Sequence, residues 1–192
     1  MVDDSIKYKE YRDEIPYNTL KTWSRKLMNN ADWKFIGWTG NAKEPLRHWA
    51  SYPELEGVLK DLWEFINASF IEDGVFLKPQ RTILNLYNHG DSSWMHVDSE
   101  DPDDWTAIVF LNEHWDINWG GDFSLVEGSE ILQSFAPTPG KFVLFKSNIL
   151  HGARPVSREA PYPRFGVAFQ CKHDSNVQGL SSLKVPAIRS TL

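Results

Sequence analysis

The sequence has little cysteine, no concentration of positive charge and no long apolar run. Cys171 is its only cysteine, so the chain has no disulfide framework and lacks the thiolates of a typical structural zinc site. The formal net charge is −6 with no Lys/Arg cluster, which argues against a nucleic-acid partner. No window approaches the length of a membrane span, so we expect no membrane partner. These absences favour an ordinary globular protein.

The first five residues are acidic and no apolar stretch follows them, so we expect no signal peptide. Together with the single thiol, this predicts a cytoplasmic location. The chain has 192 residues, of which 41% are hydrophobic, and this suits one domain over residues 1–192. We divide that domain into a helical N-terminal part, a β core and a tail, which span residues 1–75, 76–172 and 173–192.

Two N-terminal segments have the apolar spacing of amphipathic helices. The first spans about 18–30, with Asn18 or Thr19 as its cap, and the second starts at Pro53 and runs to about Phe70. An aromatic stretch, 33–38, predicts a short strand between them. The stretch 39–52 contains Gly, Asn and Pro and predicts a loop.

The remaining pattern is of β type. Short strands separated by turn residues are predicted over 76–88, 106–112, 122–126, 130–135, 141–145 and 164–171. Strands of this length and spacing are typical of a sandwich or barrel rather than of parallel βαβ units. The predicted fold class is therefore α+β and mainly β, a jelly roll with N-terminal helices that cover the outer face of one sheet.

His96, Asp98 and His151 are candidate metal ligands. On a strand, residues i and i+2 point to the same side, so His96 and Asp98 can reach one ion, and His151 would join them from another strand. The gap of 53 residues (151 − 98) leaves room for about four strands. Two imidazoles and one carboxylate on one face of an octahedral metal are the facial triad of non-haem Fe(II) oxygenases. Catalytic zinc with the same ligands remains an alternative.

Two other pairs share the His-x-Asp spacing. His89 and Asp91 flank a glycine in a turn, where strand geometry need not hold. His114 and Asp116 precede Gly120-Gly121 and remain a genuine rival to the pair at 96 and 98. We interpret two further histidines, His48 and His173, as surface or supporting residues, because neither has a carboxylate two positions later.

Arg164 is the candidate anion-binding residue. It begins a strand with two faces: Phe165, Val167 and Phe169 on one, and Arg164, Gly166, Ala168 and Gln170 on the other. A cation beside two very small residues indicates a lined cavity, and its planar guanidinium matches a carboxylate. The alternative is a salt bridge to a nearby Asp or Glu. Arg154, Arg158 and Arg81 are the other candidates for this role.

Tyr87 lies on the strand before the His-x-Asp pair, in phase with Ile83 and Asn85. This mixed face could border a polar cavity, where the Tyr87 hydroxyl would contact the same anion, or Tyr87 could be an ordinary core tyrosine. Four tryptophans could cluster at the mouth of the site, either as packing or as a substrate platform: Trp94, Trp105, Trp115 and Trp119.

Taken in order, these residues resemble the 2-oxoglutarate/Fe(II)-dependent dioxygenases, particularly their prolyl 4-hydroxylase-like branch. The resemblance covers roughly residues 80–172 and is carried by Tyr87, Gly90, His96-x-Asp98, Gly120-Gly121-Asp122-Phe123, Pro139-Gly140-Lys141, His151-Gly152 and Arg164. Their order also favours the pair at 96 and 98 over its rivals, because the pair of this family precedes its Gly-Gly segment by a full strand.

The resemblance implies a double-stranded β-helix in which His96, Asp98 and His151 hold Fe(II). It implies that 2-oxoglutarate binds the iron and places its far carboxylate on Arg164, with Tyr87 assisting, and that ascorbate serves as reductant. The partners would then be dioxygen and a peptide, protein or small-molecule substrate. Because Asp98 is present, the resemblance favours hydroxylation of an unactivated C–H bond over halogenation, with a prolyl or other amino-acid or peptidyl substrate.

Two alternatives to this function remain at the level of sequence. One is an oxygenase of a small metabolite on the same scaffold. The other is a jelly-roll binding module without turnover, in which the histidines are structural. The enzyme would release succinate from 2-oxoglutarate in the presence of oxygen, whereas the module would neither bind Fe(II) nor convert 2-oxoglutarate.

Overall fold

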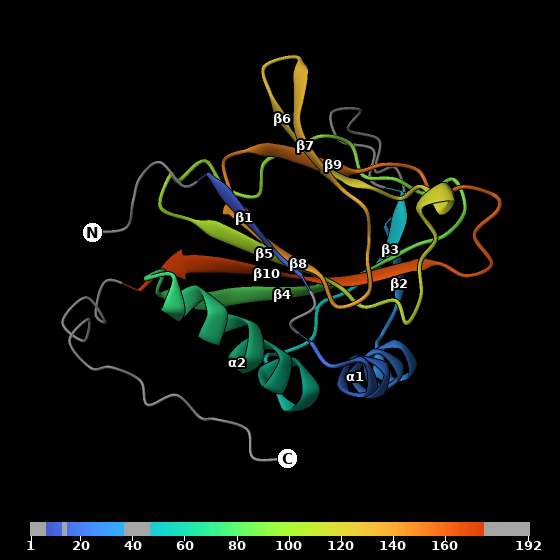
Figure 1. Ribbon diagram of the computed structural model, residues 1–192, viewed down its shortest axis with the longest axis horizontal. Helices are drawn as coiled ribbons and strands as arrows, with labels where there is room; N and C mark the ends of the chain where they lie inside the picture. Colours follow the sequence, from blue (N-terminus) through green and yellow to red (C-terminus); the bar gives the residue numbers. More distant parts are fainter. Residues whose placement is uncertain (1–6, 13–14, 37–46, 175–192) are drawn as a thin grey trace.

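The computed structural model describes residues 7–12, 15–36 and 47–174 of the chain, and two antiparallel sheets dominate it (Figure 1). The larger sheet has seven strands in the order β1-β8-β5-β10-β4-β3-β2, and the smaller has three in the order β7-β6-β9. The strands are β1 (Tyr8–Tyr11), β2 (Lys34–Ile36), β3 (His48–Ser51), β4 (Leu77–Tyr87), β5 (Trp105–Phe110), β6 (Phe123–Glu127), β7 (Glu130–Phe135), β8 (Phe142–Lys146), β9 (Leu150–Ala153) and β10 (Arg164–His173). This is the double-stranded β-helix expected from the sequence.

Two helices, α1 (Tyr17–Asn30) and α2 (Gly57–Glu72), lie beneath the larger sheet in Figure 1. Their apolar faces and the outward face of that sheet form one buried cluster, whose members include Leu20, Leu62, Ile66, Phe70, Leu84, Phe165, Val167 and Phe169. The helices therefore cover the outer face, as predicted, and the inner face of the same sheet is left to meet the smaller sheet. No helix in the described part of the chain is long and apolar enough to cross a membrane.

Between the two sheets, part of the space is filled by a second apolar cluster: Phe110, Phe123, Leu125, Phe135, Val143 and Phe145. A third cluster gathers around Tyr87, Trp115, Ala153 and Val156. A cavity of about 270 Å³ lies between the sheets, lined by His48 of β3 and by alternate residues of β4 and β10, with Val167 of β10 in addition. Strands β4 and β10 therefore each pack one face against the helices and line the cavity with the other.

Several predicted boundaries need correction. The helix predicted to start at Pro53 begins four residues later, because Gly57 (φ +52°) makes the turn into α2. Residues 48–51, predicted as loop, form β3, which pairs with Leu84 to Leu86 of β4. No bounds were predicted for β9, although His151 was expected on a separate strand, and β1 lies where no strand was expected. The strands β1, β3 and β9 are each four residues long, too short to show a period of two, and their pairing partners are distant in sequence.

The other boundaries agree closely with the pattern, and β7 spans the predicted residues 130–135. The predicted strand 33–38 is observed as β2, and its last two residues lie outside the described part. The N-terminal part contains β1, β2 and β3 as well as the helices, and all three join the larger sheet. Of the predicted tail, residues from 175 onward lie outside the described part.

Candidate metal centre and its cavity

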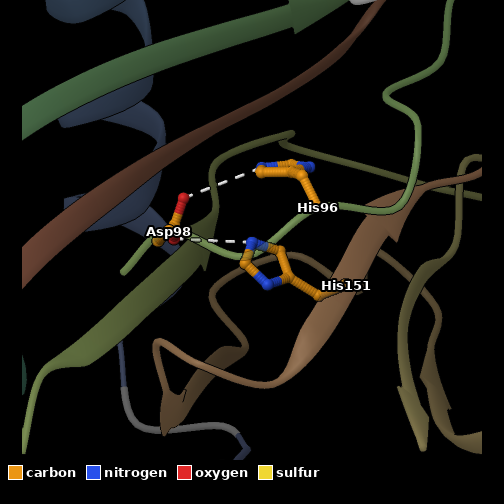
Figure 2. Close-up of side chains that lie close together, drawn as sticks. All are labelled: His96, Asp98 and His151. Atoms are coloured by element: carbon orange, nitrogen blue, oxygen red, sulfur yellow. Dashed lines mark ion pairs between the residues drawn. The ribbon is translucent and has the colours of Figure 1, made fainter. Parts of the chain in front are cut away.

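His96, Asp98 and His151 converge between the two sheets (Figure 2). His96 pairs with His151 through backbone hydrogen bonds in both directions, at 2.9 and 2.8 Å, so the segment that carries the His-x-Asp pair extends the smaller sheet beside β9. One potential ligand atom from each residue lies within 4.8 Å of the others. The Nε2 atom of His96 is 3.7 Å from Asp98 Oδ1, and that of His151 is 3.4 Å from Asp98 Oδ2.

The protons of the two imidazoles are directed away from this cluster. Nδ1 of His96 lies 2.8 Å from the carbonyl oxygen of Trp94, and Nδ1 of His151 lies 2.8 Å from that of Ile149. A carbonyl oxygen only accepts, so each Nδ1 donates, and Nε2 is the atom that each ring turns toward Asp98. Two imidazole nitrogens and one carboxylate therefore face one another, as the ligand atoms of a single metal ion would.

Asp98 is held in place by its surroundings. Thr106 of β5 donates a hydrogen bond of 2.7 Å to Asp98 Oδ2, and the Asp98 backbone N–H donates to Ser147 at 3.0 Å. Burial raises the pKa of Asp98, but hydrogen bonds from the two histidines and from Thr106 outweigh this and hold its pKa well below the usual range. The group is thus an ionised carboxylate, which is the form that binds a metal.

Arg164 lies in the same cavity, and its register partner on β4 is Tyr87. It is buried, its Nε atom has no hydrogen-bond partner, and no ion pair involves it within the described residues. Its guanidinium carbon lies 4.9 Å from the centre of the Tyr87 ring. Burial lowers the pKa of Arg164 despite opposing contributions from Tyr87 and Asp122. A buried cation that makes no ion pair is strongly disfavoured unless an anion binds there.

The position of Gly121 explains why the second residue of the Gly-Gly motif is a glycine. Its φ is +72°, and a Cβ atom at this position would lie 3.1 Å from Cδ of Arg164. Gly166, beside Arg164 on β10, would place a Cβ 2.8 Å from the Val109 carbonyl oxygen on β5. Both glycines therefore allow a close approach that a larger residue would prevent. Gly166 and Ala168 line the cavity, as the alternation along β10 predicted.

The rival pairs have other roles. Asp91 accepts a hydrogen bond from the backbone of Asn88 in a turn, and His89 contacts the exposed Arg158. Asp116 caps the short 3-10 helix Ile117–Trp119, and His114 is exposed. The exposed Arg154 lies outside the cavity. The structure thus brings His96, Asp98, His151, Arg164 and Tyr87 to one cavity and leaves these alternatives outside it.

The expected cluster of four tryptophans is wrong. Within the described part of the chain, no tryptophan lines the cavity. Trp105 packs in the core on the helix side of the sheet, whereas Trp115 and Trp119 pack edge to face, 5.5 Å apart. Trp94 contributes its backbone carbonyl to His96, and its side chain is exposed. Sequence position alone placed these residues near the site, but their side chains point elsewhere.

His48 is the cavity residue that the sequence did not identify. It is buried, stacks on Tyr87 with ring centroids 4.6 Å apart, and contacts Asn85 through Nε2 at 3.1 Å. Burial lowers its pKa to about 4, so its ring is neutral near neutral pH. The only sequence feature that could have indicated this role is the polar Asn85 on an otherwise apolar strand.

Most residues of the cavity wall lie in a part of the chain that matches a known protein family. Residues 82–170 match the family model described as 2OG-Fe(II) oxygenase superfamily, and no curated protein matches the chain. That region contains the three potential metal ligands, Arg164 and Tyr87. The donor set and the unpaired buried guanidinium fit the two groups that this family uses, Fe(II) and 2-oxoglutarate.

Solved structures of the same fold include a prolyl-4-hydroxylase from Pseudomonas putida, with 15% identity, a TM-score of 0.68 and coverage of 90% of this chain and 97% of that one. A prolyl hydroxylase from Trichoplax adhaerens, in complex with a hypoxia inducible factor peptide fragment, has 15% identity, a TM-score of 0.68 and coverage of 94% and 89%. HygX from Streptomyces hygroscopicus, with nickel and 2-oxoglutarate bound, has 14% identity, a TM-score of 0.65 and coverage of 90% and 85%. Residues 82–170 are therefore similar to the 2OG-Fe(II) oxygenase superfamily, and the chain has the fold of these prolyl hydroxylases.

Proposed function

We propose that the protein is a 2-oxoglutarate-dependent dioxygenase that hydroxylates an unactivated C–H bond of an amino-acid or peptidyl substrate, with a prolyl group as the leading candidate. The balanced reaction converts R–H, dioxygen and 2-oxoglutarate to R–OH, succinate and carbon dioxide. The proposal includes a cytoplasmic location and ascorbate as the reductant that keeps iron ferrous. The observation that carries it is the presence, in one cavity, of a two-histidine, one-carboxylate triad and a buried arginine that makes no ion pair within the described residues.

His96, Asp98 and His151 would hold Fe(II), and Arg164 with Tyr87 would bind the far carboxylate of 2-oxoglutarate. The bound iron supplies the oxidative chemistry that couples decarboxylation of 2-oxoglutarate to oxygenation of the substrate. The backbone carbonyls of Trp94 and Ile149 orient the imidazoles, and Thr106 orients Asp98. These contacts preset the ligand geometry before metal binds.

The cavity wall would restrict water around the reacting groups. Its apolar members include Ile83, Ile108, Phe123 and Ala168, and it is narrow at about 270 Å³. Ligand pockets commonly measure about 300–1,000 Å³, so the cosubstrate alone would fill much of it. An apolar wall filled by cosubstrate would limit side reactions of the oxidising step with solvent.

The test is release of succinate from 2-oxoglutarate by iron-loaded protein with ascorbate, with and without oxygen and with a panel of amino acids and proline-containing peptides. We expect slow, oxygen-dependent release without a substrate and faster release with one. His151→Ala should abolish release, whereas the exposed His114→Ala should retain it. Full activity in His151→Ala would refute the ligand assignment, and no release by the unaltered protein would favour a non-catalytic binding module.

A further inference from the structure

The cavity has a second arginine, far along the sheet from the first. Residues of β4 and β10 pair in the order Tyr87–Arg164, Asn85–Gly166, Ile83–Ala168 and Arg81–Gln170, and all eight line the cavity. Arg164 and Gln170 are six residues apart on one strand (170 − 164). At about 3.4 Å per residue the two pairs lie roughly 20 Å apart. Arg81 is therefore too distant along the wall to share the anion of Arg164.

The potential metal ligands lie nearer the Arg81 end. Thr106, which holds Asp98, is the register partner of Gln170, and Gln170 is in turn the partner of Arg81. With about 4.8 Å between neighbouring strands, the backbone of Arg81 is roughly 10 Å from that of Thr106. Arg164 thus stands at one end of the cavity wall, and Arg81 stands at the other end, together with Thr106, which holds Asp98. A cosubstrate anchored on Arg164 leaves the Arg81 end free for a second molecule.

Arg81 is held in place but has no anionic partner. Its guanidinium carbon lies 4.7 Å from the centre of the Tyr52 ring, which is itself 48% exposed. Arg81 is exposed and makes no ion pair within the described part of the chain, whereas Arg25, which is also exposed, pairs with Glu113. Stacking on an aromatic ring restricts the guanidinium while leaving its five N–H donors available, which suits a carboxylate.

The remaining space and its lining favour a small molecule. The cavity of about 270 Å³ is already small for a ligand pocket, and the cosubstrate occupies part of it. Beside Arg81 lie the amide of Gln170, its register partner, and the apolar side chain of Ile83. An amide offers both a donor and an acceptor, and the isoleucine suits a short aliphatic chain.

We propose that Arg81, held on Tyr52, binds the carboxylate of the primary substrate, which is a free acid of amino-acid size rather than a residue within a peptide. This inference rests on the proposed function, because it assigns the substrate of the same site. The carboxylate on Arg81 would direct the aliphatic part of the substrate toward His96, Asp98 and His151.

The test compares free amino acids, L-proline among them, with their carboxamides, which keep the side chain and remove the negative charge. Succinate release gives kcat and KM for each compound. Calorimetric titration into anaerobic protein loaded with Mn(II) and 2-oxoglutarate gives Kd without turnover. We expect at least one acid to accelerate succinate release and to bind at least tenfold more tightly than its amide.

Variants of Arg81 test the residue itself. Arg81→Gln should raise KM and Kd for the acid at least tenfold with a smaller change in kcat, and Arg81→Lys should recover part of the loss. Lys78→Gln is the charge-matched control, since Lys78 is an exposed cation of the same strand outside the cavity lining. It should behave as the unaltered protein.

The inference is overturned if acid and amide act equally, if no acid accelerates the reaction, or if Arg81→Gln leaves KM and Kd for the acid unchanged. Failure of the proposed function has a different outcome. In that case the unaltered protein releases no succinate under any condition, with or without an added acid. Substrate-free, oxygen-dependent release together with equal acid and amide results would reject only the role of Arg81.

Discussion

Thr106→Val tests whether the cavity presets its metal ligands. Thr106 is fully buried, and its hydroxyl donates to Asp98 Oδ2 at 2.7 Å and contacts the Ser147 hydroxyl at 2.9 Å. Valine keeps nearly the same shape and removes only the hydroxyl. A hydrogen bond to a charged group contributes about 1.5–3 kcal/mol. Loss of a residue that orients a metal ligand typically weakens metal binding by about 10–100-fold.

These two magnitudes agree, because tenfold in an equilibrium constant corresponds to about 1.4 kcal/mol. We therefore expect Thr106→Val to raise the Kd for Mn(II) by about 10–100-fold. The assay is anaerobic calorimetric titration of the metal into metal-free protein. Thr106→Ser retains the hydroxyl and should remain within a few-fold of the unaltered protein.

The matched control is Thr82→Val. Thr82 is also a buried threonine of the larger sheet, but its neighbours Arg81 and Ile83 line the cavity and it points to the opposite face. It should leave metal affinity unchanged. If Thr106→Val binds Mn(II) as tightly as Thr82→Val does, the hydroxyl does not position Asp98 and the reasoning is wrong.

Three further predictions concern other parts of the cavity. His48 has a pKa of about 4 in the fold against 6.5 when unperturbed, so the unfolded chain binds a proton that the folded chain refuses, and unfolding free energy should fall by about 3 kcal/mol as pH drops from 6.5 to 4. Urea titrations at several pH values should show that His48→Asn loses this slope while His114→Asn keeps it; equal slopes would contradict the assignment. Gly152→Ala places a Cβ 2.9 Å from a backbone oxygen of the segment preceding the His-x-Asp pair, so it should cost about 1–3 kcal/mol of stability by thermal unfolding and weaken Mn(II) binding, and an unchanged Tm would refute this. Arg164→Met should raise KM for 2-oxoglutarate by more than about 30-fold, since breaking a buried charge pair costs about 2–5 kcal/mol, while exposed Arg154→Met serves as control; an unchanged KM would move the anion site elsewhere.

Local sequence pattern was sufficient where an element is long and two-faced. The period of two along residues 164–170 correctly separated the phenylalanine face, which packs on the helices, from the Arg164 face, which lines the cavity. The same reasoning applied to Ile83, Asn85 and Tyr87 on β4. In such segments the polarity of alternate residues predicts which face is buried, and the partner strands need not be known.

Short elements and single residues did not follow from local pattern. His48 was interpreted as a surface or supporting residue because no carboxylate follows it by two positions, and its burial in the cavity wall depends on the pairing of β3 with β4. Arg81 and Tyr52 are 29 positions apart (81 − 52) and meet only because β3 leads into the same wall. The prediction for the four tryptophans failed for a related reason. They are near the His-x-Asp pair in sequence, but none of them lines the cavity.

By itself the sequence determined the chemistry that was available: a two-histidine, one-carboxylate set, an arginine on a strand of small residues, and alternating strands able to bury one face. Only the tertiary structure decided which of three His-x-Asp pairs meets His151, and that Arg164 and Arg81 stand at opposite ends of one cavity. The physical reason is that strand register joins residues far apart in the chain, and a shift of one position would turn each of these side chains to the opposite face.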